Sequence, residues 1–334
     1  MLKVAILGCG FMGTAHAASY NTLQDRVTLH TVWSRSHERA DRLAREVGAK
    51  AVADLLAAAT DPDVDVVDIC LPTHLHREAA EAALAQGKHV LLEKPIALTH
   101  EDADAIILAA EKSPSIFMVG LTLRFWPEYV ELQRRMAARE LGQPLVVSTQ
   151  RLSPPADWND WMARPELSGG VAVDLLIHDF DQMNWLLGKP RTVFARELTA
   201  GHVIATVDYS GAYGTAEGGM RMPTSYPFSS KIRVLCDAGV AEYSFEAAAA
   251  ANGGNIGEID TTAPGLRLYS SGGMVETTTA PPATDPWQPE ILYFIECVEQ
   301  NRTPERGTGE QARQALSVSI AANRSIRSGR LEPV

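Results

Sequence analysis

Apolar runs of strand length alternate with amphipathic helical segments over the first 121 residues. The runs are rich in Val, Ile and Leu, and they predict strands at residues 2–7, 27–33, 64–71, 90–92 and 116–119. Ala and Leu recur at helical spacing between them, and this predicts helices at 14–20, 36–47, 75–86 and 101–112. A βαβα order predicts a parallel, doubly wound sheet with right-handed crossovers. We expect a Rossmann domain over residues 1–121.

The pattern changes from about Leu121 onward, where β-type runs follow one another. Strands are predicted at 145–151, 192–198, 203–209, 212–220, 231–236, 240–245 and 266–269. Helices are predicted at 127–139, 171–187, 289–300 and 309–328. Runs of strands after a βα rhythm indicate a second domain of the α+β class. We expect it to span residues 122–334 on a largely antiparallel open sheet, with the last helices free to pack back on the first domain.

The amino-acid composition and net charge argue against some classes of binding partner. The 334 residues are 46% hydrophobic and 21% charged, with a formal net charge of −11 that argues against nucleic acid or an anionic membrane as partner. The four cysteines are scattered without a CxxC pair, so we expect buried thiols rather than a disulfide framework or a metal site. With neither a signal-like start nor a membrane-length apolar stretch, we expect a cytoplasmic protein.

The segment Gly8-Cys9-Gly10-Phe11-Met12-Gly13 joins the first predicted strand to the first predicted helix. In this G-x-G-x-x-G pattern the first Gly permits a tight turn, the second admits a pyrophosphate, and the third lets helix and strand pack closely. The helix N-terminus then offers unpaired N–H groups to the phosphates. The alternative is an ordinary Gly-rich turn, but the strand-to-helix context favours dinucleotide binding.

The end of the second strand bears on the type of dinucleotide. An acidic residue about twenty positions beyond the glycines would hold a ribose 2′-hydroxyl, yet Ser34 stands there and is followed by Arg35. A hydroxyl and a guanidinium suit a 2′-phosphate, so NADP is favoured over NAD, with Arg39 as a further contact. Alternatively, Ser34 only caps the helix that starts near Ser36.

Lys94 follows an apolar strand, within Leu91-Leu92-Glu93-Lys94-Pro95. At the end of a parallel strand it is a plausible proton donor or alkoxide stabiliser beside a nicotinamide; the alternative is a solvated lysine in a turn. A second candidate group is Asp174 with His178, which an i,i+4 spacing brings to one face of a helix. Asp181 continues that face by about one turn and is a further candidate for substrate contact. A carboxylate beside an imidazole suits a general acid or base, or else a packed core histidine.

These pieces, in this order, resemble the glucose–fructose oxidoreductase/inositol dehydrogenase (Gfo/Idh/MocA) oxidoreductases. The Glu93-Lys94-Pro95 tripeptide and the Asp-x-x-x-His spacing are the specific parts. The resemblance implies that Lys94, His178 and Asp174 surround the reacting carbon of a sugar or cyclitol. It also implies cofactor contacts from Glu93, Lys94 and the segment Leu71-Pro72-Thr73-His74-Leu75-His76, in which Leu71 and Thr73 depart from the family's pattern and His76 matches it.

The resemblance further implies a substrate mouth shaped by Arg124, Trp126, Trp158 and Trp161, and an open sheet face that pairs subunits into a homodimer or homotetramer. We therefore expect an NAD(P)-dependent oxidoreductase that acts on a secondary alcohol or ketone of a polyhydroxylated small molecule. Two alternatives share the fold: an NAD-dependent glycoside hydrolase, and a non-catalytic dinucleotide-binding regulator.

Overall fold

The computed structural model describes residues 1–155, 161–162, 164–199, 201–247, 265–277 and 285–334. The chain divides into two compact units. The first comprises Met1–Thr122 with Asp285–Arg313, and the second comprises Leu123–Thr284 with Gln314–Val334. Within the described parts of both units, no helix combines the length and the apolar character needed to cross a bilayer.

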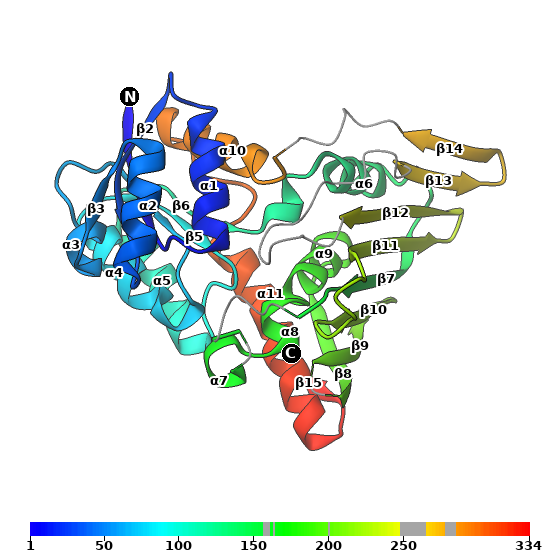
Figure 1. Ribbon diagram of the computed structural model, residues 1–334. Coiled ribbons are helices and arrows are strands. Elements are labelled where there is room, and N and C mark those ends of the chain that lie inside the picture. The colour runs from blue at the N-terminus through cyan, green and yellow to red at the C-terminus, as the bar shows by residue number, and fades with distance from the viewer. Residues whose placement is uncertain (156–160, 163, 200, 248–264, 278–284) are drawn as a thin grey trace. The chain divides into compact units, whose positions relative to one another are not determined.

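The first unit is built on a six-stranded parallel sheet with the order β3-β2-β1-β4-β5-β6 (Figure 1). Its strands are β1 (Leu2–Leu7), β2 (Val27–Trp33), β3 (Lys50–Val52), β4 (Val66–Ile69), β5 (His89–Glu93) and β6 (Phe117–Gly120). The predicted doubly wound parallel sheet is confirmed. The strand order reverses between β1 and β4, and ligands of such sheets bind at the carboxyl ends of the strands beside this reversal.

The helices of the first unit are α1 (Phe11–Asn21), α2 (His37–Val47), α3 (Leu55–Ala59), α4 (His76–Ala85), α5 (His100–Lys112) and α10 (Gln288–Glu299), with the 3₁₀ turn η1 (Thr73–Leu75). The side chains of Ser36, Asp54 and Thr99 accept backbone N–H bonds at the N-termini of α2, α3 and α5. Gly48 ends α2 at φ +72°, a left-handed conformation that glycine adopts without strain.

Helix α10 belongs to the first unit although it follows most of the second in sequence. It packs against α1, where the rings of Phe11 and Trp287 meet edge to face at 5.5 Å. The side-chain amide of Gln288 donates to Thr22 Oγ1 over 2.7 Å, and the Ser19 hydroxyl donates to the carboxylate of Asp285. Distant parts of the chain therefore build one side of the first unit.

The second unit carries a nine-stranded sheet with the order β14-β13-β12-β11-β7-β10-β9-β8-β15. Only the β7–β10 pairing is parallel among its described strands, so the largely antiparallel α+β domain is confirmed. The strands are β7 (Pro144–Leu152), β8 (Pro190–Thr199), β9 (His202–Tyr209), β10 (Ala212–Gly219), β11 (Phe228–Cys236), β12 (Gly239–Ala247), β13 (Leu266–Ser270), β14 (Gly273–Thr277) and β15 (Glu332–Pro333).

One face of this sheet is buried and the other is open. On β9, Val203, Ala205 and Val207 point into the core, whereas Ile204 is 47% exposed. The buried face lies against α9, which contacts β7 and β10 (Figure 1). The remaining helices are η2 (Thr122–Arg124), α6 (Pro127–Ala137), α7 (Pro165–Ser168), α8 (Val171–Asp174), α9 (Ile177–Leu187) and α11 (Gly309–Ser328).

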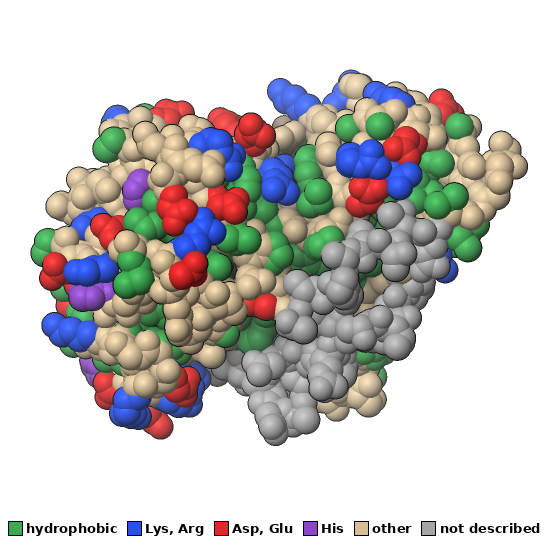
Figure 2. Space-filling view, turned by 90° about the horizontal axis from the view of Figure 1, so that it is seen from above, with side chains coloured by type: hydrophobic (Ala, Val, Ile, Leu, Met, Phe, Trp, Pro, Cys, Tyr) green, Lys and Arg blue, Asp and Glu red, His purple; other side chains and the backbone are tan. Residues whose placement is uncertain are grey.

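Positive and negative side chains are interspersed over the surface seen in Figure 2, where the described residues form no broad patch of a single sign. This distribution agrees with the formal net charge of −11. Proteins that bind nucleic acid gather Lys and Arg on one face, and the described surface in that view lacks such a face.

Candidate functional site

The turn after β1 has the geometry that the glycine pattern predicts. Gly8 has φ +109°, and a Cβ atom there would lie 2.3 Å from the carbonyl oxygen of Cys70, just beyond β4. A Cβ atom on Gly13 would lie 1.7 Å from the carbonyl oxygen of Gly8, so α1 packs on the turn more closely than any side chain allows. Gly10 instead faces open space, with no atom within 4 Å of a Cβ placed there. The middle glycine therefore leaves its backbone accessible to a phosphate.

The N-terminus of α1 opens onto this space. Gly10 is the N-cap and no side chain caps the helix, and no acidic residue stands in its first turn. The first backbone N–H groups of a helix have no intrahelical acceptor, and the helix dipole favours an anion beside them. Phe11 and Met12 are half-buried there. The residues present therefore fit the pyrophosphate of a dinucleotide.

Three arginines follow the end of β2, and their charges act on groups near the glycine turn and the segment after β4. Ser34 is buried and its Oγ accepts the Ser36 amide over 3.3 Å, while Ser36, not Ser34, caps α2. Arg35 is exposed, and its positive charge, after burial, lowers the pKa of His74. Burial raises the pKa of Cys9 to about 11, although the charges of Arg42 and Arg39 favour its thiolate.

Arg42 was not singled out from the sequence. Its position three residues after Arg39 on α2 is the signal that could have found it, because residues three apart share a helix face.

A buried histidine connects the segment that follows β4 to the segment around Lys94. His76 is fully buried, with Nδ1 2.9 Å from the carbonyl oxygen of Pro95 and Nε2 2.9 Å from that of Leu71. Burial lowers the pKa of His76. Leu71 and Thr73 are also buried. The predicted contacts of these three residues with the cofactor stay predictions, and the bonds of His76 show that it joins two backbone segments.

Lys94 stands at the carboxyl end of β5, in the same sheet as the glycine turn. It is half-buried, and its amide donates to Glu93 Oε2 over 2.9 Å. Glu93 is only 5% exposed. The carboxyl ends of parallel strands lie at one edge of a sheet, so this placement suits a group that acts beside the nicotinamide.

Asp174 and His178 lie in the second unit, but not on one continuous helix. Asp174 ends α8 and His178 is the second residue of α9, so the prediction of a single helix over 171–187 is wrong here. The Leu176 amide bonds five residues back to Val171, and the Asp179 amide bonds only three residues back to Leu176. The i→i−4 ladder is thus interrupted between the two residues. Asp174 is 7% exposed and His178 is half-buried.

The residues predicted at the substrate mouth have differing surroundings. Arg124 and Asp181 form a buried ion pair at 2.8 Å. Trp126 packs edge to face on Phe245, with ring centroids 5.1 Å apart. Trp161 is half-buried in a turn, and Trp158 lies outside the described residues. Their contacts with a substrate stay predictions.

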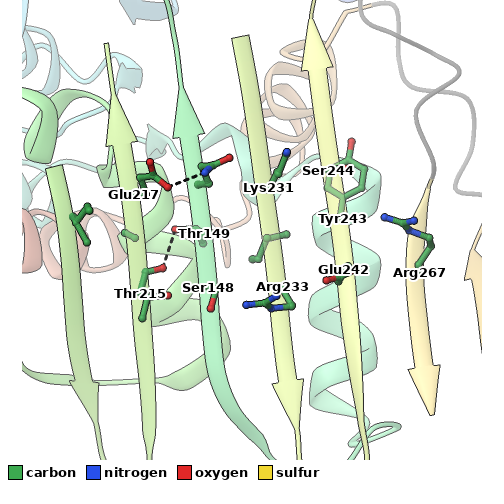
Figure 3. Close-up of a pocket in the computed structure, with 14 residues that line it drawn as sticks. Ser148, Thr149, Thr215, Glu217, Lys231, Arg233, Glu242, Tyr243, Ser244 and Arg267 are labelled. Carbon is green, nitrogen blue, oxygen red and sulfur yellow. Dashed lines mark hydrogen bonds between the residues drawn. The ribbon is translucent and has the colours of Figure 1, made fainter. Parts of the chain in front are cut away.

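A polar depression marks the open face of the second unit's sheet (Figure 3). Register places Thr215, Ser148, Arg233, Glu242 and Arg267 side by side on five neighbouring strands. Arg233 and Arg267 flank Glu242 in this arrangement, so basic and acidic side chains alternate from strand to strand.

Comparison with known proteins decides the family. Residues 2–121 match the family described as "Oxidoreductase family, NAD-binding Rossmann fold", and residues 129–242 match the "GFO/IDH/MocA C-terminal domain". The chain belongs to the Gfo/Idh/MocA oxidoreductases. This Gfo/Idh/MocA protein is therefore an oxidoreductase with an NAD-binding Rossmann domain, as the resemblance implied.

The similarity to known relatives extends over nearly the full length of this chain. It is 27% identical to myo-inositol 2-dehydrogenase of Thermotoga maritima, over 100% of this chain and 99% of that protein. It is 28% identical to scyllo-inositol 2-dehydrogenase (NAD(+)) of Bacillus subtilis, over 98% and 95% of the two chains. The structure of levoglucosan dehydrogenase in complex with NADH and levoglucosan has a TM-score of 0.82 at 22% identity, with 100% and 99% coverage. This last likeness concerns the fold.

Proposed function

We propose that this oxidoreductase is an NAD(P)-dependent dehydrogenase that acts on a secondary alcohol, or the corresponding ketone, of a sugar, cyclitol or sugar derivative. The observation that carries the proposal is the position of Lys94 at the carboxyl edge of the sheet that presents the glycine turn. The activities of the two inositol dehydrogenases support the substrate class.

The proposed mechanism divides the work among three side chains. The nicotinamide, when bound, supplies or accepts the hydride. His178 takes the proton from the substrate hydroxyl during oxidation and returns it during reduction. Lys94 stabilises the negative charge that develops on the substrate oxygen, because an ammonium group in a partly buried position interacts strongly with an alkoxide. Asp174 orients the imidazole of His178.

NADP(H) is the proposed preferred cofactor. The support is the buried hydroxyl of Ser34 in the place of an acidic residue, with Arg35 directly after it and exposed. A 2′-phosphate would receive charge-assisted bonds from Arg35, and the charges of Arg39 and Arg42 lie near the glycine turn. A ribose 2′-hydroxyl has no such charge to offer.

The functional test is a panel of cyclitols, sugars and keto-sugars with NAD(H) and NADP(H), followed at the absorbance of the reduced nicotinamide. Net formation of reduced cofactor with a polyol supports the proposal. Cleavage of a glycoside without net formation of reduced cofactor would support the hydrolase alternative. Tight cofactor binding without turnover of any member of the panel would support the regulator.

We also propose that the protein is a homodimer or homotetramer that pairs through the open sheet face. The face presents Arg233 beside Glu242, which a second copy can complement, and the apolar side chains of Ile204, Tyr213 and Leu235 are exposed by 42–55%. Light scattering at micromolar concentration should give the mass of two or four chains. Tyr213→Glu should lower that mass, and a monomeric wild-type protein would refute the proposal.

A further inference from the structure

Three buried side chains form a chain of polar contacts beneath the glycine turn. Asp68 on β4 and His16 on α1 are both 0% exposed, and Asp68 Oδ2 lies 2.8 Å from His16 Nδ1. The other ring nitrogen, Nε2, lies 3.4 Å from Oε1 of Glu93 at the end of β5. All three belong to the first unit. One imidazole thus stands between two carboxyl groups.

Burial and the neighbouring carboxylate of Asp68 have opposite effects on the charge of His16. Burial alone would lower the pKa of His16, but the carboxylate of Asp68 outweighs it, so the pKa lies well above its usual value. The cationic form of the ring donates its Nδ1–H to Asp68, and its Nε2 makes an ion-pair contact with Glu93 at 3.4 Å without a hydrogen bond. Removing either carboxylate would leave a buried charge without its partner, which is costly. The contacts therefore fix where the carboxyl group of Glu93 stands.

Glu93 in turn binds the backbone of the next residue, Lys94. Its Oε2 accepts the amide N–H of Lys94 over 2.9 Å, while its Oε1 faces His16. On the following side of the turn, His76 Nδ1 is 2.9 Å from the carbonyl oxygen of Pro95. Hydrogen bonds thus hold the backbone at Lys94 and at Pro95, on both sides of the peptide bond that joins them.

A second carboxyl group shares the pocket of Glu93. Glu290, on α10, is 0% exposed. A Cβ atom on Gly120 would lie 3.2 Å from Glu290 Oε1 and 3.3 Å from Glu93 Oε1. Two neighbouring buried carboxyl groups do not both ionise readily. Burial, and after it the charge of Glu93, raises the pKa of Glu290 to about 8, so Glu290 is the member of the pair whose ionisation is disfavoured.

We propose that Asp68, His16 and Glu93 form a positioning relay that sets the conformation of Lys94 for hydride transfer. Asp68 anchors His16, His16 anchors the carboxylate of Glu93, and Glu93 holds the peptide N–H of Lys94. The proposal rests on the proposed function, in which Lys94 touches the substrate. None of the three relay residues has to touch it.

The two ring nitrogens of His16 can be replaced separately. In His16→Asn the amide nitrogen takes the place of Nδ1 and keeps the contact with Asp68. In His16→Gln it takes the place of Nε2 and keeps the contact with Glu93. His30→Asn, on β2, controls for the loss of an imidazole elsewhere in the same sheet.

The first readout is hydrogen exchange of the peptide that covers residues 93–96, where Pro95 has no amide hydrogen and Lys94 is the amide bound by Glu93. The relay predicts that His16→Asn raises the exchange rate of the Lys94 amide by about tenfold or more, as expected for loss of a charge-assisted bond. His16→Gln should raise it much less, and His30→Asn should leave it unchanged. Equal exchange in both His16 variants would overturn the relay.

The second readout is single-turnover hydride transfer at saturating cofactor and substrate. His16→Asn should slow the transfer by about tenfold or more, with little change in cofactor affinity, and His16→Gln should retain most of the rate. If both His16 variants lose the same part of the transfer rate, and this loss only follows their fall in melting temperature, then His16 has a structural role and the proposal is overturned. If neither His16 variant folds, Asp68→Asn replaces them: faster exchange supports the relay, and unchanged exchange overturns it.

Failure of the relay and failure of the proposed function give different results. Hydrogen exchange needs no substrate, so it judges the relay even if no sugar or cyclitol reacts. Conversely, wild-type hydride transfer by Lys94→Ala would refute the role of Lys94 and leave the exchange result intact. With Lys94 already replaced by Ala, a working relay predicts that adding His16→Asn slows the transfer no further.

Discussion

Arg124 and Asp181 bind each other through a bidentate ion pair within the second unit. Nε and Nη2 of Arg124 donate to the two carboxylate oxygens of Asp181 over 2.8–3.1 Å. The two side chains are only 4% and 2% exposed. The guanidinium carbon also lies 5.0 Å from the ring centroid of Trp185. Such a pair is held in one geometry by charge, hydrogen bonds and packing together.

Removing one member of this pair should be strongly destabilising. Arg124→Ala or Asp181→Ala would leave the other charge buried and unpaired, and a loss of about 3–5 kcal/mol in the free energy of unfolding is expected. Arg134→Ala, which removes the solvent-exposed partner of Glu131, serves as the control and should have a far smaller effect. Chemical denaturation of the three variants checks this. Losses of similar size at Arg124 and Arg134 would contradict it.

Cofactor preference should depend on Arg35. Direct titration of the wild-type protein should show tighter binding of NADP(H) than of NAD(H). Arg35→Ala should weaken NADP(H) binding by about tenfold or more and NAD(H) binding much less, because in the proposed complex the lost charge contacts only the 2′-phosphate. Arg45→Ala, at an exposed position in the last turn of α2, is the matched control. Tighter binding of NAD(H) by the wild-type protein would refute the preference.

Glu290 should make stability depend on pH. Burial, and after it the charge of Glu93, raises the pKa of Glu290 from 4.5 to about 8. Below about pH 4.5 the carboxyl group is protonated in both the folded and the unfolded chain, so no penalty exists there. Between there and about pH 8 the unfolded chain releases this proton first, and folded-state stability is lost at about 1.4 kcal/mol per pH unit. Above about pH 8 this loss is complete.

The substitution Glu290→Gln removes this titration. Relative to wild type, its free energy of unfolding should therefore improve by a few kcal/mol, about 1.4 kcal/mol for each unit, as the pH rises from 5 to 8. Denaturation of both proteins at each pH gives the difference, with the exposed Glu111→Gln on α5 as control. A difference that stays constant over this range would mean that Glu290 is ionised in the folded protein.

Local sequence signals predicted most of the fold around the glycine turn. The strand before Gly8, the helix that follows it and the tight packing between them follow from side-chain size and backbone conformation at adjacent positions, although α1 begins at Phe11, earlier than the predicted helix at 14–20. The parallel sheet and the largely antiparallel second sheet follow from the rhythm of apolar runs. Short elements such as β3 and α3, of three and five residues, were missed because they carry too few residues for a period to show.

Contacts between distant residues were beyond such reasoning. His16 meets Asp68 across 52 positions, and Glu290 reaches Glu93 from a helix that returns to the first unit near the end of the chain. The only local hint was a charged residue inside an apolar strand, as Asp68 is in Val66–Ile69. The interruption between Asp174 and His178 also escaped the i,i+4 spacing, because nearly every residue there is buried and no polar face marks the break.

The central claim is that Lys94 and His178 carry the reaction. His178→Asn should slow hydride transfer and abolish its pH dependence near neutrality, where an imidazole titrates. Asp174→Asn should be less severe if this carboxylate only orients His178. Cofactor affinity should change little in each variant, since the proposed site of the phosphates is the glycine turn.

The most direct measurement is single-turnover hydride transfer by Lys94→Ala at saturating cofactor, with the substrate that the panel identifies. The exposed lysine Lys50, at the start of β3, provides the control Lys50→Ala, which should keep the wild-type rate. A fall of about 10²–10⁴-fold in Lys94→Ala, the usual contribution of a positioned proton-transfer group, is the predicted result. Transfer by Lys94→Ala at the wild-type rate would contradict the assigned mechanism.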